Sequence, residues 1–481
     1  MRNSKRGSIR IPDSGIAATR ALTKSVRTPF WLDSPESPAA RPGLFGDRRA
    51  DLVVVGGGFT GLWTALRAAE REPGREIVLL EADRLSSAAS GRNGGFVESS
   101  VTHGLENGLR HFPNEIAALE SLGAANLDAI ESTIADEQLD CAFVRPGAYS
   151  VATASWHVTA LVESGQIARD HGLEIELLEG SSMRAQVRSP TYLGGLRVSG
   201  RSSALVDPAR LAWGLAEVIE RRGATIHERT RALAITENRV GGVDVITPDG
   251  VVSGGQVVLA TSAFPPLVKK IRRYVLPVYD YVLVTEPLNA TTLGEIGWRG
   301  REGISDLGNQ FHYYRLTEDD RILFGGYDAI YHYNNGVRPE LEVRRDTFEL
   351  LAGHFFTTFP QCEGVEFTHA WGGAIDTCSR FCAYFDTALA GRVAYAAGFT
   401  GLGVGASRFA ADVLLDLLGG TSTERTELEM VRTKPFPFPP EPLRSIVVGA
   451  TRRSLIRADE RDGQRNLWLH LLDAMGVGFD S

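Results

Sequence analysis

The chain has 481 residues, of which 43% are hydrophobic and 23% are charged, as in an ordinary globular protein. Its length favours two structural domains over a single core. The net charge is −8, which argues against nucleic acid or an anionic membrane as the main partner. No stretch approaches the roughly 20 apolar residues of a membrane span, and no secretory signal begins the sequence, so we expect a cytoplasmic protein.

The cysteines indicate neither a disulfide framework nor a metal site. The four of them, Cys141, Cys362, Cys378 and Cys382, are few for this length and fit a reducing compartment. Cys378 and Cys382 lie four positions apart, without a second Cys or His pair at zinc-site spacing. We therefore expect four small core residues and no bound metal.

Residues 1–28 differ from the rest of the chain because they are basic and polar. They are predicted to form a disordered tail, and an arm that binds a partner is the alternative. The proline-rich residues 29–47 are expected to be an ordered lead-in to the first domain.

The first regular elements are a strand, a helix and a second strand. Residues 51–55 are apolar and run directly into a glycine cluster. A helix is predicted over residues 58–72, where apolar residues recur at helical spacing and Pro73-Gly74 ends the pattern. Residues 77–80 form the second apolar strand. Strand, helix and strand in this order predict a parallel sheet.

Helices and strands also alternate further along the chain. Helices are predicted over residues 114–135 and 156–172, and another begins at Asp207-Pro208, where the carboxylate caps and the proline fits the first turn. A last helix follows Gly403. Strands are predicted over residues 144–152, 257–260, 311–316, 322–325 and 392–397, with a hairpin turn at 317–320.

The most informative motif is G-x-G-x-x-G at Gly56, Gly58 and Gly61, between the first strand and the first helix. The first glycine permits a tight turn, the second lets the backbone approach a diphosphate, and the third lets the helix pack closely on the strand. The N-terminal end of the helix then faces the phosphates. Gly57, Phe59 and Thr60 complete this dinucleotide-binding loop.

An acidic residue accompanies the glycine motif. Glu81 lies 20 residues after Gly61 (81 − 61), at the end of the second strand, and Ala82 follows it. A carboxylate there accepts hydrogen bonds from ribose hydroxyls and repels a 2′-phosphate, which disfavours NADP. The motif alone does not separate NAD from FAD.

A second glycine turn favours FAD. Gly398, Thr400, Gly401, Leu402 and Gly403 lie between a strand and a helix near the end of the chain, where a simple NAD dehydrogenase needs no such turn. The N-terminus of that helix is placed to face N1 and the C2 carbonyl of a flavin, where reduced flavin carries negative charge.

A third segment, Ala89-Ser90-Gly91-Arg92-Asn93-Gly94-Gly95, is rich in small residues and hydrogen-bond donors. Ser90 and Arg92 are candidates to contact phosphate oxygens. Asn93, Gly94 and Gly95 would let the backbone lie against an isoalloxazine ring. A plain surface loop is the alternative.

Together these segments resemble the D-amino-acid-oxidase-type FAD oxidoreductases. The resemblance rests on G-G-G-F-T-G-L, L-E-A-D, A-S-G-R-N-G-G and G-F-T-G-L-G, and it spans about residues 30–420. It extends the FAD-binding set to Thr261, after the strand 257–260. The lead-in Phe30-Trp31-Leu32-Asp33 is most similar to the gamma-glutamylputrescine oxidoreductase and putative aminophosphonate oxidoreductase branches, which the residues do not separate.

The resemblance implies an α/β fold, with a Rossmann-like FAD-binding domain and an interleaved antiparallel sheet domain that covers the flavin. We assign residues 29–140, 201–268 and 366–425 to the first, 141–200 and 269–365 to the second, and 426–481 to a C-terminal extension. It also implies that a C–H bond next to an amine nitrogen gives hydride to flavin N5, after which the imine is hydrolysed.

Two departures from this family stand out. Sarcosine oxidase has a lysine that activates oxygen on a substrate-domain strand, whereas the matching stretch 321–325 places an apolar residue there. The electron acceptor, oxygen or another carrier, is therefore open. Leu402 replaces the histidine that many members carry in the second glycine turn, so flavin contacts there would be through the backbone.

Candidate substrate residues are Tyr279, Tyr313, Arg315 and Trp371. Strand alternation places Tyr313 and Arg315 on one face and His312 and Tyr314 on the other. Arg315 would pair with an anionic substrate group, and the aromatic residues would line the pocket. Ordinary sheet packing, and for Arg315 a surface position, are the alternatives.

The sequence thus predicts an FAD-dependent oxidoreductase that oxidises a C–N bond of an amine or amino-acid-like substrate. An aminophosphonate-specific enzyme and a flavin-binding protein that acts mainly through a partner are the alternatives. An NAD-dependent dehydrogenase is disfavoured by the second glycine turn.

Overall fold

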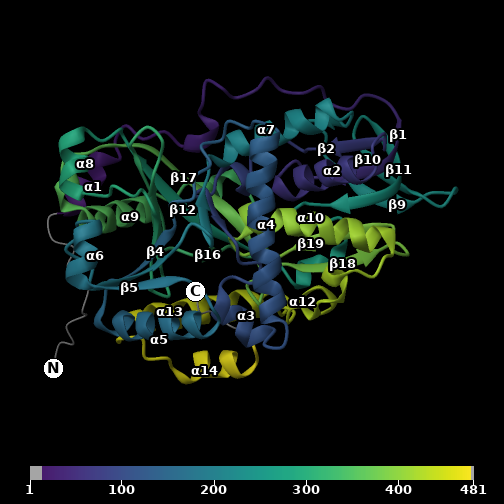
Figure 1. Ribbon diagram of the computed structural model, residues 1–481. Coiled ribbons are helices and arrows are strands. Elements are labelled where there is room, and N and C mark those ends of the chain that lie inside the picture. The colour runs from purple at the N-terminus through teal and green to yellow at the C-terminus, as the bar shows by residue number, and fades with distance from the viewer. Residues whose placement is uncertain (1–13, 478–481) are drawn as a thin grey trace.

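The computed structural model describes residues 14–477, whose two large sheets lie side by side (Figure 1). The chain enters the first sheet three times, within residues 48–80, 225–259 and 384–397, and the second sheet twice, within residues 148–198 and 276–377. A parallel-sheet domain and a mainly antiparallel-sheet domain are therefore interleaved, which confirms the predicted fold class.

The first sheet has the parallel core of a dinucleotide-binding domain. β19, β11, β1, β2 and β8 are parallel neighbours, and their buried strands are almost wholly apolar, as expected for strands covered on both faces. The strands, in spatial order followed by the hairpin beside β11, are β18 (Tyr384–Ala388), β19 (Val393–Ala397), β11 (Gly250–Leu259), β1 (Arg48–Val55), β2 (Ile77–Leu80) and β8 (Thr225–His227), then β10 (Val243–Thr247) and β9 (Ala234–Glu237).

Helices cover one face of this sheet. Leu52, Val54 and Leu79 point into a core that these helices share, whereas Val53, Val55 and Leu80 point into a second core on the opposite face, against the β9–β10 hairpin. The side chain of Asp207 caps one helix by accepting from two backbone N–H groups, as the sequence predicted. The covering helices are α2 (Phe59–Arg71), α4 (Ile116–Asp136), α7 (Pro208–Arg221) and α10 (Gly403–Gly419).

The second sheet stands over the glycine-rich loops of the first domain. Its strands are β16 (Ile330–Tyr331), β12 (Leu276–Thr285), β15 (Ile322–Gly326), β14 (His312–Leu316), β13 (Gly303–Asp306), β4 (Ala148–Ala152), β6 (Gly194–Val198), β5 (Ile175–Glu179) and β17 (Phe367–Thr377), which pairs with β12. A separate pair, β3 (Phe96–Glu98) and β7 (Ser203–Leu205), links the two domains.

Aromatic packing closes the outer face of the second sheet. Tyr281, Tyr314 and Phe324 pack there with Phe348 and Phe355 of α9 (Arg345–Thr358). The remaining helices are α1 (Ser14–Ala21), α3 (Leu105–His111), α5 (Ser155–Asp170), α6 (Gly180–Gln186), α8 (Ala290–Ile296), α11 (Glu424–Glu427), α12 (Glu429–Arg432), α13 (Leu443–Asp459) and α14 (Leu467–Ala474), with short 3-10 turns at Phe30–Leu32, Ala89–Gly91, Lys269–Arg273, Pro339–Glu342 and Pro360–Cys362.

The predicted disordered tail is wrong for the part that can be described. Residues 1–13 lie outside the described residues. Ser14–Ala21 form α1, which packs on α9, and Ala18, Ala21 and Leu22 are buried. The backbone of Val26 also pairs with strand β17. The sequence missed this helix because its apolar residues are small and its flanks are basic.

One predicted domain boundary also moves. Residues 366–377 were assigned to the FAD-binding domain, but β17 pairs with β12 from Leu276 to Thr285 in the second sheet. The second sheet therefore extends to Thr377. An alternating strand does not reveal its partner, which explains the misplacement.

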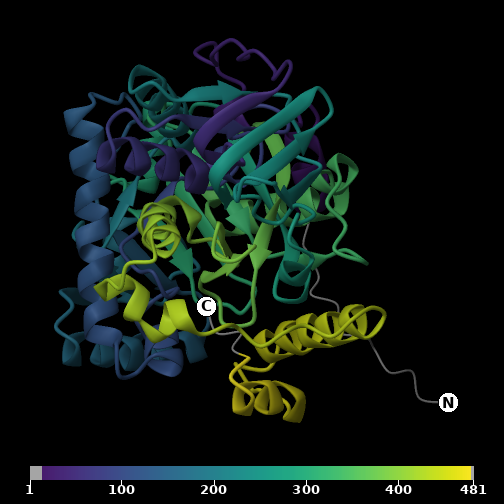
Figure 2. The same cartoon turned by 90° about the vertical axis from the view of Figure 1, so that its right-hand side faces the viewer.

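The C-terminal helices α13 and α14 project from one side of the molecule (Figure 2). The Asp459 carboxylate accepts from the backbone N–H groups of Asn309 and Gln310 at 3.0 and 3.1 Å, and Arg452 forms an ion pair with Asp328. Both contacts are with the loops that flank β14 and β15. This part of the extension is therefore attached to the second domain, whereas Lys434, nearer its start, pairs with Asp386 of β18 in the first.

The cysteines lie where the sequence predicted. All four are buried and none forms a disulfide. Across residues 14–477 no group of three or more His, Cys, Asp or Glu residues is arranged to hold a metal ion. Within the same residues no helix is both long enough and apolar enough to cross a bilayer.

Candidate active site

The G-x-G-x-x-G loop has the geometry that its glycines predict. Gly56 has φ of +114°, and a Cβ on it would lie 2.3 Å from the carbonyl oxygen of Ala260. A Cβ on Gly61 would lie 1.9 Å from the carbonyl oxygen of Gly56, so the helix packs on the loop with no room for a side chain. The N–H of Gly58 makes no hydrogen bond within residues 14–477 and remains free for a ligand.

Glu81 connects the loop to the end of β2. Its carboxylate accepts from the N–H of Gly57 at 2.7 Å and from the N–H of Asp83 at 2.8 Å. Burial raises the pKa of Glu81, against the opposing effect of these backbone hydrogen bonds. Two hydrogen bonds leave carboxylate lone pairs for a ribose hydroxyl, and the side chain is only half-buried. Ala82 beside it is exposed.

Residues 89–95 lie against the dinucleotide-binding loop. The Ser90 hydroxyl accepts from the N–H of Phe59 at 2.9 Å, at the first turn of α2. The Asn93 side chain donates to the carbonyl oxygens of Ala89 and Ser90 and accepts from the N–H of Gly95. Asn93 therefore holds the shape of the segment, and Ser90 fixes its position against α2.

Two tryptophans hold this segment from outside. The Trp31 indole N–H donates to the carbonyl oxygen of Asn93 at 2.8 Å, and the Trp371 indole N–H donates to that of Arg92 at 3.0 Å. Trp31 comes from the lead-in and Trp371 from β17. Both rings are almost completely buried, so they position the backbone rather than offer a free ring face.

Arg92 points towards the second domain rather than towards the dinucleotide-binding loop. Its Nε donates to the carbonyl oxygen of Ser87 at 2.6 Å, and its Nη1 donates to the carboxylate of Glu342 at 2.5 Å and to the carbonyl oxygen of Gly372 at 3.1 Å. The sequence proposed it as a phosphate ligand, but these bonds place it as a link between domains.

The second glycine turn approaches the same region. The Asp376 carboxylate accepts from the N–H of Gly398 at 2.8 Å, and burial raises the pKa of this carboxyl group to about 6. The Thr400 hydroxyl donates to the carbonyl oxygen of Gly398. A Cβ on Gly401 or Gly403 would meet no atom within 4 Å, so the space before α10 is open.

Three further residues predicted to bind FAD, Thr261, Leu402 and Thr60, lie next to the two glycine turns. Thr261 follows β11 and lies next to the Ala260 carbonyl oxygen that meets Gly56. Leu402 is the N-cap of α10, and it makes no side-chain capping bond. Thr60 lies in the first turn of α2.

Tyr313 of the second sheet faces residues 89–95, the segment expected to lie against a flavin ring, which we call the flavin loop. A Cβ placed on Gly94 would lie 2.8 Å from the Tyr313 ring, so the ring packs directly against this glycine. The Tyr313 hydroxyl donates to the carboxylate of Asp280 on β12 at 2.6 Å. Burial and the adjacent carboxylate raise the pKa of Tyr313 well above its ordinary value, so the hydroxyl stays protonated.

Arg315 lies on the same face of β14, as predicted, but it is buried. Its Nη1 donates to the carbonyl oxygens of Val206 at 2.8 Å and Gly95 at 3.1 Å. Its guanidinium also stacks near Trp31, 5.6 Å from the ring centroid. The surface alternative is therefore wrong, and the guanidinium is a bridge between β14 and the flavin loop.

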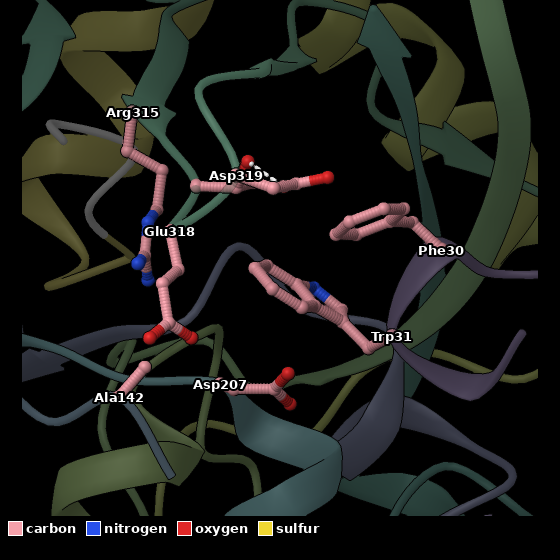
Figure 3. Close-up of a pocket in the computed structure, with 8 residues that line it drawn as sticks. Phe30, Trp31, Ala142, Asp207, Arg315, Glu318 and Asp319 are labelled. Atoms are coloured by element: carbon pink, nitrogen blue, oxygen red, sulfur yellow. Dashed lines mark hydrogen bonds between the residues drawn. The ribbon is translucent and has the colours of Figure 1, made fainter. Parts of the chain in front are cut away.

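A cavity of about 290 Å³ adjoins Arg315 (Figure 3). The Trp31 ring projects into the space between Arg315 and Phe30, and the carboxylates of Asp207 and Glu318 lie on the same side as the guanidinium (Figure 3). No residue of either glycine turn lines this cavity. The carboxylates at its wall make it unsuited to an anionic substrate group.

Tyr279 is not part of this arrangement. It alternates with Asp280 on β12 and faces the outer core, where its hydroxyl donates to the carbonyl oxygen of Arg338 at 3.4 Å. The sequence identified the correct strand but the wrong face. Asp280, which the sequence did not single out, occupies the face that looks towards the flavin loop.

The sequence also missed Glu98 and Asp376. Each is an acidic residue in an apolar stretch, and that pattern is the signal that would have found them. Their partners come from distant segments, Ser203 for Glu98 and Gly398 for Asp376, so their roles could not be read locally.

Comparisons with known proteins place the chain among flavoenzymes. The sequence model of the DAO family, described as FAD dependent oxidoreductase, matches residues 51–417. Gamma-glutamylputrescine oxidoreductase of Escherichia coli is 30% identical over 396 residues, which cover 80% of this chain and 88% of that protein. The probable oxidoreductase OrdL of Haemophilus influenzae is 26% identical over 408 residues, 83% of this chain and 90% of that protein.

Solved structures agree on the fold. Glycine oxidase from Geobacillus kaustophilus superposes with a TM-score of 0.67 at 19% identity and covers 80% of this chain and 99% of its own. L-amino acid deaminase from Proteus vulgaris gives 0.63 at 17% identity, with 82% and 100% covered. Both cover most of this chain with the same two-domain architecture.

Proposed function

The chain belongs to the DAO family of FAD-dependent oxidoreductases, and from this premise we propose that it oxidises a C–N bond of an amine or amino-acid-like substrate. This proposal is carried by the contacts among three segments. Ser90 of residues 89–95 accepts from Phe59 after the G-x-G-x-x-G loop, and Gly94 borders Tyr313 of β14. Gly405, in the first turn of α10, borders the backbone of Glu98. The proteins compared above are named as a gamma-glutamylputrescine oxidoreductase, a glycine oxidase and an L-amino acid deaminase, which supports this reaction class.

The first part of the proposed FAD site binds the nucleotide half. The free N–H of Gly58 and the first turn of α2, with Phe59 and Thr60, face the diphosphate. Glu81 accepts from the ribose hydroxyls while it holds Gly57 and Asp83. The donor set fits the group, because an N–H without a partner lies at a helix N-terminus.

The second part binds the ring. Gly94 and Gly95 carry the backbone against which a planar ring lies, and Gly401 and Gly403 leave open space before α10. The dipole of α10 then favours negative charge on the pyrimidine side of the ring. Further proposed contacts are through the backbone and small side chains of Ser90, Asn93, Thr261, Gly398, Thr400 and Leu402.

FAD bound at this site would supply the acceptor for the hydride from the C–H bond next to the amine nitrogen, and water would then hydrolyse the imine. The protein's own part is to hold the amine in its neutral form beside the ring and to exclude water. The Tyr313 hydroxyl borders that space and is held in place by the hydrogen bond that it donates to Asp280. Arg315 and Trp371 act by positioning residues 92–95.

The electron acceptor in this proposal is oxygen or another carrier. Leu323 of β15 is buried in an apolar cluster with Trp371 and Val282, on the face where sarcosine oxidase is expected to have a lysine. Within residues 14–477 the lysines, Lys24, Lys269, Lys270 and Lys434, are exposed. This arrangement favours a carrier other than oxygen.

An anaerobic reduction screen tests the proposed function. Purified protein is expected to be yellow, with absorbance near ~450 nm as in oxidised flavins. Diamines and their conjugates, aminophosphonates, N-methyl amino acids and D-amino acids are added without oxygen. Bleaching by at least one class supports the proposal, and a yellow protein that no amine bleaches contradicts it.

A further inference from the structure

Asp280 is an acidic side chain at the centre of the second sheet, on the face that looks towards the flavin loop. Its carboxylate accepts from the Tyr313 hydroxyl at 2.6 Å and from the N–H of Tyr281 at 2.8 Å. It remains partly exposed, as do Val278 and Ile375, which share its face. On the opposite face of β12 the neighbouring residues Tyr279 and Tyr281 are fully buried, so solvent does not reach the strand from that face. Solvent therefore reaches Asp280 from the flavin side of the sheet.

No positively charged side chain within residues 14–477 forms an ion pair with Asp280. Other enclosed carboxylates of this protein do have such partners: Asp412 and Asp416 pair with Arg71, and Glu228 pairs with Arg84. Asp207 and Asp376 are satisfied as caps of backbone N–H groups. Asp280 thus keeps a negative charge that the described residues leave uncompensated, which is costly unless a ligand supplies the cation.

The arginines near this face are already committed. Arg315 uses Nη1 for the carbonyl oxygens of Gly95 and Val206, and Asp207 lies beside it at the cavity wall. Arg92 is paired with Glu342 and bonded to Gly372. Gly373, which pairs with Asp280 across β12 and β17, is the residue that borders Arg92. Neither guanidinium is therefore free to bind a substrate carboxylate.

A second acidic side chain lies on β3, the strand whose Phe96 packs on Tyr313. Glu98 lies on the same side of β3 as Phe96, whose ring packs on Tyr313 at 5.8 Å between centroids. It is half-buried, and its carboxylate accepts from the Ser203 hydroxyl at 2.9 Å with no cation partner in the described part of the chain. Its backbone also borders Gly405 of α10. Burial raises the pKa of Glu98 to about 7, so this carboxyl group is only partly ionised at neutral pH.

We propose that Asp280 is a specificity-determining residue that binds a protonated nitrogen of the substrate, so that the preferred substrate carries a second, cationic nitrogen in addition to the amine that reacts. Tyr313 fixes the carboxylate by donating to it. A substrate with a carboxylate at that position is disfavoured because like charges would meet in a space of low dielectric constant. This inference rests on the proposed function.

The test compares ligands of equal length. α,ω-Diamines are measured against the monoamine and the ω-amino acid of the same chain length, by the concentration dependence of anaerobic flavin bleaching, or by competition when a ligand does not react. We expect the diamine to bind about tenfold to a hundredfold more tightly than either, as a hydrogen bond to a charged group provides.

Two variants assign this preference to Asp280. Asp280→Asn keeps the shape and the acceptor for Tyr313 and should abolish most of the preference. Asp244→Asn, on β10 of the other domain, removes a carboxylate of the same kind and should leave it unchanged. FAD content and melting temperature of each variant show whether it is folded.

The outcomes distinguish a failure of this inference about Asp280 from a failure of the proposed amine oxidation. Equal or tighter binding of the ω-amino acid by the unaltered protein would overturn the inference, whether or not Asp280→Asn folds. So would a folded Asp280→Asn protein that keeps the diamine preference. Flavin bleaching by amino acids in either case would still support amine oxidation, whereas bleaching by no amine would remove the proposed function itself.

Discussion

At the scale of single residues, Gly58 determines whether a diphosphate fits at the dinucleotide-binding loop, and Asp280 determines which charge on the substrate is favoured. Gly58 has an extended backbone with φ of −85°, so its lack of a side chain is required by what it faces rather than by backbone strain. A Cβ there would lie 2.8 Å from the Ser90 hydroxyl, which accepts from the N–H of the next residue, Phe59. A larger side chain at position 58 would therefore crowd the turn at which the diphosphate is proposed to bind.

Gly58→Val tests this crowding. The branched side chain should exclude the diphosphate, and the purified variant should be colourless and contain little FAD. The measurement is FAD released per chain on denaturation. Gly294→Val on α8 is the matched control, because a Cβ there meets no atom within 4 Å, and it should keep its FAD. Full FAD occupancy in Gly58→Val would refute the loop assignment.

The ionisation of Asp280 should make the affinity for diamines depend on pH. Burial raises its pKa to about 6, with the nearby charge of Asp328 adding to the effect and the hydrogen bond from Tyr313 opposing it. Tyr313 stays protonated over this range, whereas Glu98, whose pKa burial raises to about 7, also loses negative charge as pH falls. Below pH 6 the Asp280 carboxyl group is neutral, so diamine binding should weaken as pH falls from 7 to 5. Binding that is unchanged over this range in the unaltered protein would contradict the role of Asp280.

The same raised pKa predicts a change in stability. A carboxyl group whose pKa rises on folding stabilises the folded state below its unfolded pKa, and this stabilisation is lost as pH rises through about 6. Without ligand, Asp280→Asn should therefore be more stable than the unaltered protein at pH 8, by about 1–3 kcal/mol, and similar to it at pH 4. Denaturant unfolding of the FAD-free proteins at both values measures this, and a less stable variant at pH 8 would oppose it.

Pairs of elements hold the site together across the domain boundary. β14 reaches the flavin loop through Arg315, β17 reaches it through Trp371, and the lead-in reaches it through Trp31. All three end on backbone carbonyl oxygens within or next to residues 92–95. The loop thus keeps its shape because the second domain is in place.

Arg315→Met should loosen this connection. It keeps much of the apolar stem but leaves the carbonyl oxygens of Gly95 and Val206 without their donor, at a cost of about 3 kcal/mol. We expect a lower melting temperature and faster loss of FAD on dialysis. Arg345→Met, an exposed helix position with a surface ion pair, is the control and should change little. Unaltered FAD retention in Arg315→Met would show that the bridge is not needed.

The elements that the sequence predicted well are those with a local cause. The strand 51–55, the helix after Gly58, the strand 77–80 and the helix capped by Asp207 follow from periodicity, glycine and capping within a few residues. Pairing between distant segments has no such cause. β17 was therefore placed in the wrong domain, and Tyr279 on the wrong face of β12.

The same reason limits what the sequence says about the site. The glycines of the three loops were found because each needs a particular backbone geometry. Arg315 was found, but its partners Gly95 and Val206 lie more than a hundred positions away, so an interdomain bridge looked like a substrate ligand. Asp280 is also an acidic residue in an apolar strand, but that pattern does not show which distant residue it faces, and it was missed.

At the scale of the whole molecule, the chain encloses the site between two interleaved domains and then adds an extension. The side-chain contacts of α13 described above are with the loops around β14 and β15, including the ion pair of Arg452 with Asp328. Trp156 of α5 also packs near Gly463, between the two C-terminal helices. Helices α13 and α14 therefore support the second domain, whereas the start of the extension, with Leu428, Met430 and Val431, belongs to the core of the first domain.

Removal of residues 443–481 should separate these roles. The shortened protein is expected to keep one FAD per chain and to melt at a lower temperature, because the loops at residues 306–310 and 327–336 lose their contacts. FAD content and thermal unfolding are the measurements. A shortened protein that folds but no longer holds FAD would show that the extension belongs to the cofactor site.

If the protein oxidises amines as proposed, the C–H bond next to the amine nitrogen breaks while the flavin is reduced. Rapid anaerobic mixing with a reactive amine whose carbon next to that nitrogen bears either hydrogen or deuterium measures this step. We expect the flavin absorbance to bleach in both cases and more slowly with deuterium, since that bond breaks in the step observed. Bleaching at the same rate with both isotopes under saturating substrate, or no bleaching, would contradict the proposal.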